Sequence, residues 1–146
     1  MEVWLPRIEA AQVIVVGGGN ERYLIKVMRE SSFAEELPRL LETRLYVGIS
    51  AGAMVTGKLL TPDANVIVYP EEQSPDPSEQ GLDLVNLSLV PHIGSENFPA
   101  CTPENLEKVA ALIDCPLYGL DDASALSVSD GIVEKVEEGD LYTYNM

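Results

Sequence analysis

The chain has 146 residues and a formal net charge of −15, from 9 Lys and Arg against 24 Asp and Glu. This length suits one domain, and 46% hydrophobic with 23% charged residues is typical of a globular protein with its own core. The negative charge would repel a polyanion, so we expect no nucleic-acid partner. No apolar run approaches the ~20 residues that span a bilayer, so we expect no membrane partner either.

The first half of the chain alternates between predicted strands and helices. Residues 11–16, AQVIVV, are a short β-branched run stopped by three glycines, which predicts a buried strand. Asn20 is a favourable N-cap, and apolar residues at helical spacing predict a helix after it. We expect that helix to continue over 31–44, with a kink or break at Pro38. Residues 44–49, RLYVGI, predict a second buried strand, and a short helix of small residues follows it.

A polar stretch separates the two halves. Residues 70–81 hold three prolines and predict an exposed loop. Residues 87–94, LSLVPHIG, predict a strand that ends near a proline. Residues 101–114 predict a helix, with Thr102 as N-cap and Pro103 at its first position.

The last third of the chain predicts strands only. Residues 116–120, PLYGL, read as a buried strand, and residues 124–138 read as a hairpin that turns at Asp130-Gly131. Residues 141–144, LYTY, could add an edge strand. The whole pattern predicts an α/β fold: a parallel-core sheet flanked by helices, with an antiparallel C-terminal hairpin.

Polar or glycine-rich groups follow four of the predicted strands. They are the loop at 17–19, Ser50, His92 and the pair Asp121-Asp122. In open α/β sheets, binding groups gather beyond the carboxyl ends of the strands. We therefore expect these groups at one edge of the sheet.

The pattern Gly48-x-Ser50-x-Gly52 is that of a nucleophile elbow. A serine hydroxyl needs a base, usually a histidine, and His92 is the only histidine in the chain. The tetrahedral oxyanion needs N–H donors, and the N–H of Ala51 is placed to serve it. A second donor could come from the glycine loop, at Gly18 or Gly19.

Each of these features also has an ordinary structural explanation. The elbow pattern has only three fixed positions, and an isolated histidine after a strand is more often structural. The loop GGGNER lacks both the G-x-G-x-x-G spacing and the Walker lysine, so it predicts no nucleotide site. Asp121-Asp122 could be a solvated turn, and the acidic pairs at 35–36, 71–72 and 137–138 read as exposed charge. The hypothesis of a catalytic serine therefore depends on the combination of groups.

Four motifs in chain order resemble the S51 peptidase family, which includes peptidase E, the aspartyl dipeptidase, and cyanophycinase. They are VIVVGGGN, YVGISAGAMV, LVPHIG and LYGLDDASALSV, and they span about Ala11 to Val133. The resemblance implies a single domain over 1–146, with a fold like that of class I glutamine amidotransferases. It also implies hydrolysis of short peptides with an N-terminal aspartate, without metal or cofactor.

The resemblance also implies roles for individual residues. Ser50 would be the nucleophile and His92 the base, and Asp122 would be the acid that orients the base. Asp121 is its close rival, and Asp63 matches a region where the family carries an aspartate. The oxyanion donors would be Ala51 and a glycine of the 17–19 loop, and weaker substrate-binding candidates are Asn20 and Arg22.

Three features of the chain depart from the family or leave its pattern incomplete. Family members carry further strands before the GGGN strand, so the N-terminal strands of the family are missing here and a strand edge would lie open. We therefore expect a homodimer or larger homo-oligomer through that edge, with Trp4 helping to cover it. Glu21 stands where the family usually has a small hydroxyl residue, and a negative charge there does not suit an anionic substrate. Recognition of an aspartyl side chain needs a positively charged group. The nearest candidates in sequence are Arg22 and Lys58.

The sequence leaves three functions open. The leading hypothesis is a serine peptidase of the dipeptidase kind that works through an acyl-enzyme. The second is a remnant or binding module that keeps the fold without turnover, and the third is another amidohydrolase or esterase on the same scaffold. Two cysteines, Cys101 and Cys115, are too few for a disulfide framework and favour a reducing, cytoplasmic location. With a single histidine, they also argue against a metal site.

Overall fold

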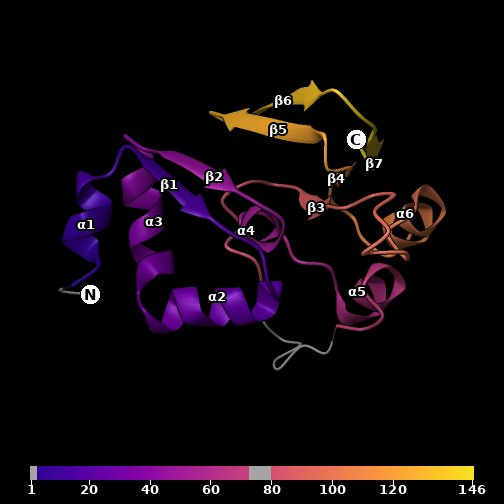
Figure 1. Ribbon diagram of the computed structural model, residues 1–146, viewed down its shortest axis with the longest axis horizontal. Coiled ribbons are helices and arrows are strands. Elements are labelled where there is room, and N and C mark those ends of the chain that lie inside the picture. Colours follow the sequence, from indigo (N-terminus) through magenta and orange to yellow (C-terminus); the bar gives the residue numbers. More distant parts are fainter. Residues whose placement is uncertain (1–2, 73–79) are drawn as a thin grey trace.

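The computed structural model describes residues 3–72 and 80–146. The central part of the loop predicted over 70–81 therefore lies outside the described residues. Figure 1 shows an elongated arrangement in which the N-terminal helices and the α5–α6 pair lie at opposite ends.

The first predicted strand, loop and helix are present. Strands β1 (Val13–Val16) and β2 (Leu45–Gly48) pair in parallel, and Val16 lies opposite Gly48 in their register. Helices α2 (Glu21–Glu30) and α3 (Phe33–Leu41) connect them and lie along one side of the pair in Figure 1. Ile14 is buried, whereas Val13 and Val15 are exposed, so β1 covers the core with one face only.

The predicted break in the first helical segment is wrong in its position. The chain breaks at Ser31 and Ser32, where Ser32 takes a left-handed conformation with φ 62°, and α3 begins directly after it. Pro38 lies inside α3 without ending it. A proline removes one helical hydrogen bond, and the burial of Leu37 and Leu40 on the core face of the same helix holds the segment helical around it.

The second half forms a mixed sheet and a hairpin. Strands β3 (Ser88–Val90) and β4 (Leu117–Leu120) are parallel, and β7 (Leu141–Tyr144) adds to β4 in the antiparallel direction. Helix α6 (Pro103–Ala110) connects β3 to β4, and Thr102 caps it as predicted. Strands β5 (Ser124–Ser129) and β6 (Ile132–Glu137) form the predicted hairpin. Asp130 and Gly131 both have positive φ at its turn, as a type I′ turn requires.

The expectation of one continuous sheet is not met. The described strands form three separate sheets, and β2 is not hydrogen-bonded to β3. The short helix α4 (Ala51–Met54) packs against both strands, and Gly48 of β2 and Leu89 of β3 line one cavity. A hydrophobic pattern specifies that a segment is extended, but it does not specify which strand edge lies beside it.

Two helices were not predicted from the sequence. Helix α5 (Pro62–Val68) begins with the same threonine–proline signal as α6, because the Thr61 hydroxyl accepts a hydrogen bond from the Ala64 N–H. Helix α1 (Leu5–Ala10) follows Trp4, whose ring meets Phe33 edge-on at 5.6 Å between centroids. Trp4 therefore anchors the N-terminal segment to α3.

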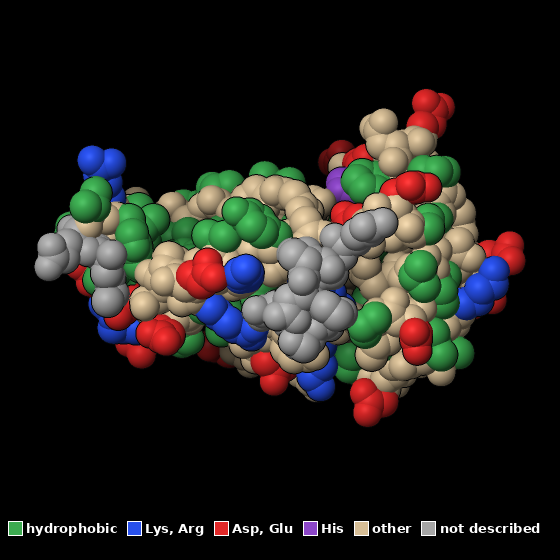
Figure 2. Space-filling model, turned by 90° about the horizontal axis from the view of Figure 1, so that it is seen from below, with side chains coloured by type: hydrophobic (Ala, Val, Ile, Leu, Met, Phe, Trp, Pro, Cys, Tyr) green, Lys and Arg blue, Asp and Glu red, His purple; other side chains and the backbone are tan. Residues whose placement is uncertain are grey.

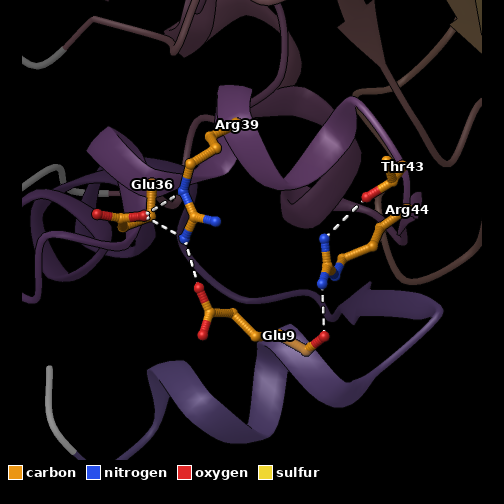
Figure 3. Close-up of polar contacts among 5 residues, drawn as sticks. All are labelled: Glu9, Glu36, Arg39, Thr43 and Arg44. Atoms are coloured by element: carbon orange, nitrogen blue, oxygen red, sulfur yellow. Dashed lines mark hydrogen bonds and ion pairs between the residues drawn. The ribbon is translucent and has the colours of Figure 1, made fainter.

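Polar contacts strengthen the attachment of α1 (Figure 3). The Arg39 guanidinium donates to the carboxylates of Glu9 and Glu36 at 2.8 and 2.7 Å. Arg44 donates to the backbone carbonyl of Glu9 and, at 2.9 Å, to the Thr43 hydroxyl. These contacts join α1 to α3 and to the start of β2.

The acidic surplus is dispersed on the face that Figure 2 shows. Asp and Glu side chains are scattered over it, and Lys and Arg side chains lie among them. No helix in the described part of the chain has the length and apolar character needed to cross a membrane.

Candidate active site

Ser50 lies on a sharp turn between β2 and α4. Its backbone has φ 55° and ψ −121°, a conformation that non-glycine residues rarely adopt. A Cβ at Gly48 would lie 2.5 Å from the carbonyl oxygen of Gly52, and one at Gly52 would overlap the carbonyl oxygen of Val16. The two glycines therefore allow the turn to pack against β1, and Ser50 is held in the strained geometry typical of functional sites.

His92 is brought to Ser50 from 42 residues further along the chain. It follows β3 with φ 67°, and its Nε2 lies 2.8 Å from Ser50 Oγ. The imidazole stacks on the Phe98 ring with centroids 4.4 Å apart and planes 8° from parallel. This contact fixes the plane of the histidine ring.

Asp122 completes a chain of hydrogen bonds. Its Oδ1 lies 2.7 Å from His92 Nδ1. A carboxylate accepts only, so the Nδ1 carries the proton and the Nε2 is left to accept from the Ser50 hydroxyl. This is the tautomer that a general base needs. The Asp122 side chain is 66% exposed, so solvent screens its attraction for a positively charged His92.

Asp121 and Asp63 do not occupy this position. The Asp121 carboxylate accepts from the Asp140 N–H at 2.6 Å and from the Ala123 N–H at 2.9 Å. These hydrogen bonds, with that from Asp140 foremost, lower the pKa of Asp121 below its usual value. Asp63 is exposed in the first turn of α5 and forms no hydrogen bond with His92. Of the three aspartates, only Asp122 is bonded to His92 in the described structure.

The three predicted oxyanion donors lie in the neighbourhood of Ser50. Ala51 is the first residue of α4, and a Cβ at Gly18 would lie 3.5 Å from Ser50 Oγ. Gly19 has φ 135° and lines a cavity together with Ser50. Within the described residues, the N–H groups of Gly18, Gly19 and Ala51 donate to no backbone carbonyl. None of these three N–H groups is therefore engaged by the backbone of the described residues.

The two weaker substrate-binding candidates have structural partners instead. The Asn20 side chain caps α2 by accepting from the Tyr23 N–H at 2.9 Å. Arg22 is buried and donates to the Leu60 carbonyl, with its Nε 3.9 Å from Glu21 Oε1. Neither residue lines a cavity that contains Ser50.

Two cavities open on Ser50 and His92. The first has about 370 Å³ and runs between β2, β3 and the β5–β6 hairpin; Asp122 and apolar side chains such as Leu89 and Leu126 line it. The second has about 230 Å³ and is lined by Gly19, Glu21, Ser50, Met54, Tyr69, Glu72, His92 and Phe98. No lysine or arginine lines either cavity within the described residues.

Three side chains of the second cavity were missed or misread from the sequence. Glu72 was expected to be exposed charge, yet its Oε2 is buried and has no hydrogen-bond partner in the described structure. Burial, followed by the charge of the nearby Glu21, raises the pKa of Glu72 to about 7. Tyr69 and Phe98 stand outside any motif, so only the way the chain folds brings them here. Burial raises the pKa of Tyr69 well above its usual value, and the phenol stays neutral.

The described residues contain no group of three or more His, Cys, Asp or Glu side chains placed to hold a metal ion. Cys101 and Cys115 are both buried free thiols. Burial raises the pKa of Cys101 to about 11.

The fold resembles that of a solved structure. A crystal structure of a "Putative Peptidase E Protein" from Listeria monocytogenes EGD-e superposes with a TM-score of 0.71 at 19% identity. The match covers 92% of this chain and 63% of that chain. This likeness shows a shared α/β fold.

The sequence is similar to those of proteins that are named as peptidases. It is 32% identical over 136 residues to Peptidase E of Haemophilus influenzae Rd, covering 88% of this chain and 60% of that protein. It is 31% identical over 129 residues to a Drosophila melanogaster protein named "Probable alpha-aspartyl dipeptidase", covering 83% of this chain and 51% of that protein. The chain thus spans between half and two thirds of the length of these relatives.

The sequence profile of Peptidase family S51 matches residues 4–136, a range that contains the elbow serine, the histidine and the acidic pair. The chain is therefore a member of peptidase family S51.

Proposed function

We propose that the protein is a serine peptidase that cleaves short peptides through an acyl-enzyme. The observation that supports this most strongly is the unbroken chain of hydrogen bonds from Ser50 through His92 to Asp122, at 2.8 and 2.7 Å. These distances lie within the reach that proton transfer requires.

The proposed reaction has two steps. Ser50 Oγ attacks the peptide carbonyl carbon while His92 Nε2 takes the hydroxyl proton, and the oxyanion accepts from the N–H groups of Ala51 and Gly18 or Gly19. His92 then gives the proton to the leaving amine, and the C–N bond breaks. Water, deprotonated by His92, hydrolyses the resulting ester and restores Ser50. Asp122 holds the histidine tautomer in both steps.

The substrate is proposed from the relatives. One of them is named "Probable alpha-aspartyl dipeptidase". Dipeptides with an N-terminal aspartate are therefore the first substrates to test on this chain. The serine mechanism is independent of that choice, because the elbow and the histidine do not read a side chain.

A fluorophosphonate probe tests the nucleophile directly. We expect one adduct, located at Ser50 by mass spectrometry, and its loss in His92→Ala. Folded protein that takes up no probe would contradict the proposal and favour a binding module that has kept the fold without turnover. Labelling without cleavage of any Asp-Xaa dipeptide would support Ser50 as the nucleophile and would contradict the proposed substrate.

A further inference from the structure

His92 is held both at the edge of its ring and on a ring face. At the edge, Nε2 lies 2.8 Å from Ser50 Oγ and Nδ1 lies 2.7 Å from Asp122 Oδ1. The Asp122 side chain is 66% exposed, so solvent weakens its hold on the imidazole. Neither hydrogen bond covers a face of the ring. A contact on the ring face is therefore what resists tilting of the imidazole out of its plane.

The contact on that face is the Phe98 side chain. Its ring is stacked on the imidazole, with centroids 4.4 Å apart and planes 8° from parallel. Packed aromatic rings attract each other beyond the effect of the area that they bury. When the imidazole takes a proton it becomes a cation, and the face of a benzene ring also attracts a cation. The stack therefore suits His92 in both of its protonation states.

The backbone between the two rings is folded into consecutive turns. Ser95 donates its N–H to the His92 carbonyl, and Phe98 donates its N–H to the Ser95 carbonyl, both at 3.1 Å. The Cys101 N–H donates to the Phe98 carbonyl, and the Gly94 N–H donates to the Cys101 carbonyl, both at 2.9 Å. These hydrogen bonds close the loop and return residue 98 to residue 92.

Tyr69 supports this arrangement from the core. It is only 5% exposed, and its ring meets the Phe98 ring edge-on with centroids 6.1 Å apart. Its hydroxyl donates to the carbonyl of Pro91, the residue directly before His92, at 3.4 Å. Phe98 thus lies between a buried aromatic ring and the imidazole, and both neighbours fix its position.

We propose that Phe98 is a positioning residue that keeps the His92 imidazole in the orientation in which Nε2 accepts the Ser50 proton. This inference rests on the proposed peptidase function, because it concerns the base of that reaction. Phe98 transfers no proton and acts only through His92. It limits the orientations that the imidazole can take, and a misplacement of about 1 Å in a reacting group can lower a rate by about 100-fold.

Proton NMR tests the stack without requiring turnover, because His92 is the only histidine in the chain and gives the only imidazole signals. Protons above the face of a benzene ring are shifted upfield by its ring current. We expect such a shift for the carbon-bound imidazole protons of the wild type, and its loss in Phe98→Leu. Spectra recorded over a range of pH separate this shift from the effect of protonation.

The chain offers a matched control. Phe33 is the only other phenylalanine, and it meets Trp4 edge-on instead of any group of the candidate active site. Both phenylalanines are partly buried. Phe33→Leu should therefore keep the imidazole shifts and the reactivity of Ser50, although it also removes an aromatic contact.

The rate of fluorophosphonate labelling at Ser50 then tests the role of the stack. The dependence of this rate on probe concentration separates probe binding from the chemical step. Phe98→Leu should slow the chemical step between about 10-fold and 100-fold and change probe binding by less than about threefold. Phe98→Tyr keeps the ring, so its chemical step should stay within about threefold of wild type.

Imidazole shifts that persist in Phe98→Leu would overturn the stack. A normal chemical step in a variant that has lost the shifts would overturn the positioning role. If Phe98→Leu does not fold, Phe98→Met replaces it in both measurements, because the flexible methionine side chain fills irregular gaps without a ring. The proposed peptidase function fails separately: wild-type protein would then take up no probe, whether or not the imidazole shifts are present.

Discussion

At the scale of single residues, the two adjacent aspartates after β4 have different tasks. Asp122 bonds to His92, whereas Asp121 accepts from the N–H groups of Ala123 and Asp140. A Cβ at Gly139 would overlap the Asp121 carboxylate, so the chain around residue 139 is built closely about it. The pair therefore consists of one carboxylate that is bonded to His92 and one that is bonded to the backbone.

Substitution of each aspartate by asparagine should separate these tasks. Asp122→Asn should lower kcat between about 10-fold and 10⁴-fold, because an amide no longer enforces the His92 tautomer. Its free energy of unfolding should stay within about 0.5 kcal/mol of wild type, since the side chain is largely exposed. Asp121→Asn should lower the free energy of unfolding, because the single amide oxygen cannot replace the two carboxylate oxygens that accept from Ala123 and Asp140. Labelling of Ser50 should persist in this variant. If Asp121→Asn lowered kcat and Asp122→Asn lowered the stability to urea, the two assignments would have to be exchanged.

The raised pKa of Glu72 predicts a pH-dependent stability. Glu21, Tyr69 and Cys101 face this group, and burial is the first cause of the shift to about 7. The folded protein keeps the Glu72 proton at pH values where the unfolded chain, with an ordinary glutamate pKa, has released it. The contribution to stability is therefore fully present below the unfolded pKa and is lost as pH rises through about 7.

Glu72→Gln should be less sensitive to this change, because the amide does not ionise. We expect urea unfolding to show the variant gaining stability relative to wild type between pH 5 and pH 8. Glu71→Gln should show no such gain. A difference between Glu72→Gln and wild type that does not change with pH would argue that Glu72 titrates normally.

At the scale of elements, the elbow depends on how closely α4 approaches β1. The carbonyl of Val16 fills the space where a Cβ at Gly52 would stand, whereas a Cβ at Gly17 would meet nothing within 4 Å. The glycines near the site therefore differ in the packing that they allow, although all of them belong to glycine-rich motifs.

Alanine substitutions should reveal this difference. Gly52→Ala should destabilise the protein by about 1–3 kcal/mol and displace Ser50 from His92, because α4 must move away from β1. Gly17→Ala should stay within about 1 kcal/mol of wild type, since its position is open. The measurements are the urea midpoint and the rate of fluorophosphonate labelling. Equal effects of the two variants would mean that backbone freedom, and not close packing, explains Gly52.

At the scale of the whole molecule, the β1–β2 pair exposes an apolar face. Val13, Val15, Leu45 and Val47 are all more than a third exposed, and β2 has no hydrogen-bonded neighbour other than β1 among the described strands. The helices cover the other face. The homodimer predicted from the sequence was expected through an open strand edge, and it stays a prediction. The exposed face of the same two strands is a separate surface on which a dimer can be tested.

We predict that sedimentation will show a dimer that dissociates in Val15→Glu. The patch residues are uncharged, but each copy carries a net charge of −15, so the dimer should tighten as salt screens the repulsion between copies. Val66→Glu is the control, because Val66 is similarly exposed but lies on α5. A monomer at all protein and salt concentrations would remove the dimer from consideration.

The family follows from the sequence because its motifs are short and local. The elbow glycines, the threonine–proline start of α6 and the Asp130-Gly131 turn each depend on a few neighbouring residues. Backbone sterics and hydrogen bonding fix such features wherever they occur in the chain. The strands and most helices were predictable for the same reason, while α5 was missed although its start has the α6 signal.

The tertiary structure alone decided which groups meet. Ser50 and His92 are 42 residues apart, and His92 and Asp122 are 30 apart. Asp121 and Asp122 are the same residue type, so the sequence alone does not say which of them meets His92. The packing at the end of β4 directs Asp122 to His92 and Asp121 to the backbone of Asp140. The sequence predicts Glu72 to be exposed charge, yet the fold buries its Oε2 atom, and the charge of Glu21 reaches it. Such outcomes depend on how distant elements pack, which no local pattern specifies, and they determine which side chains line the cavity beside Ser50.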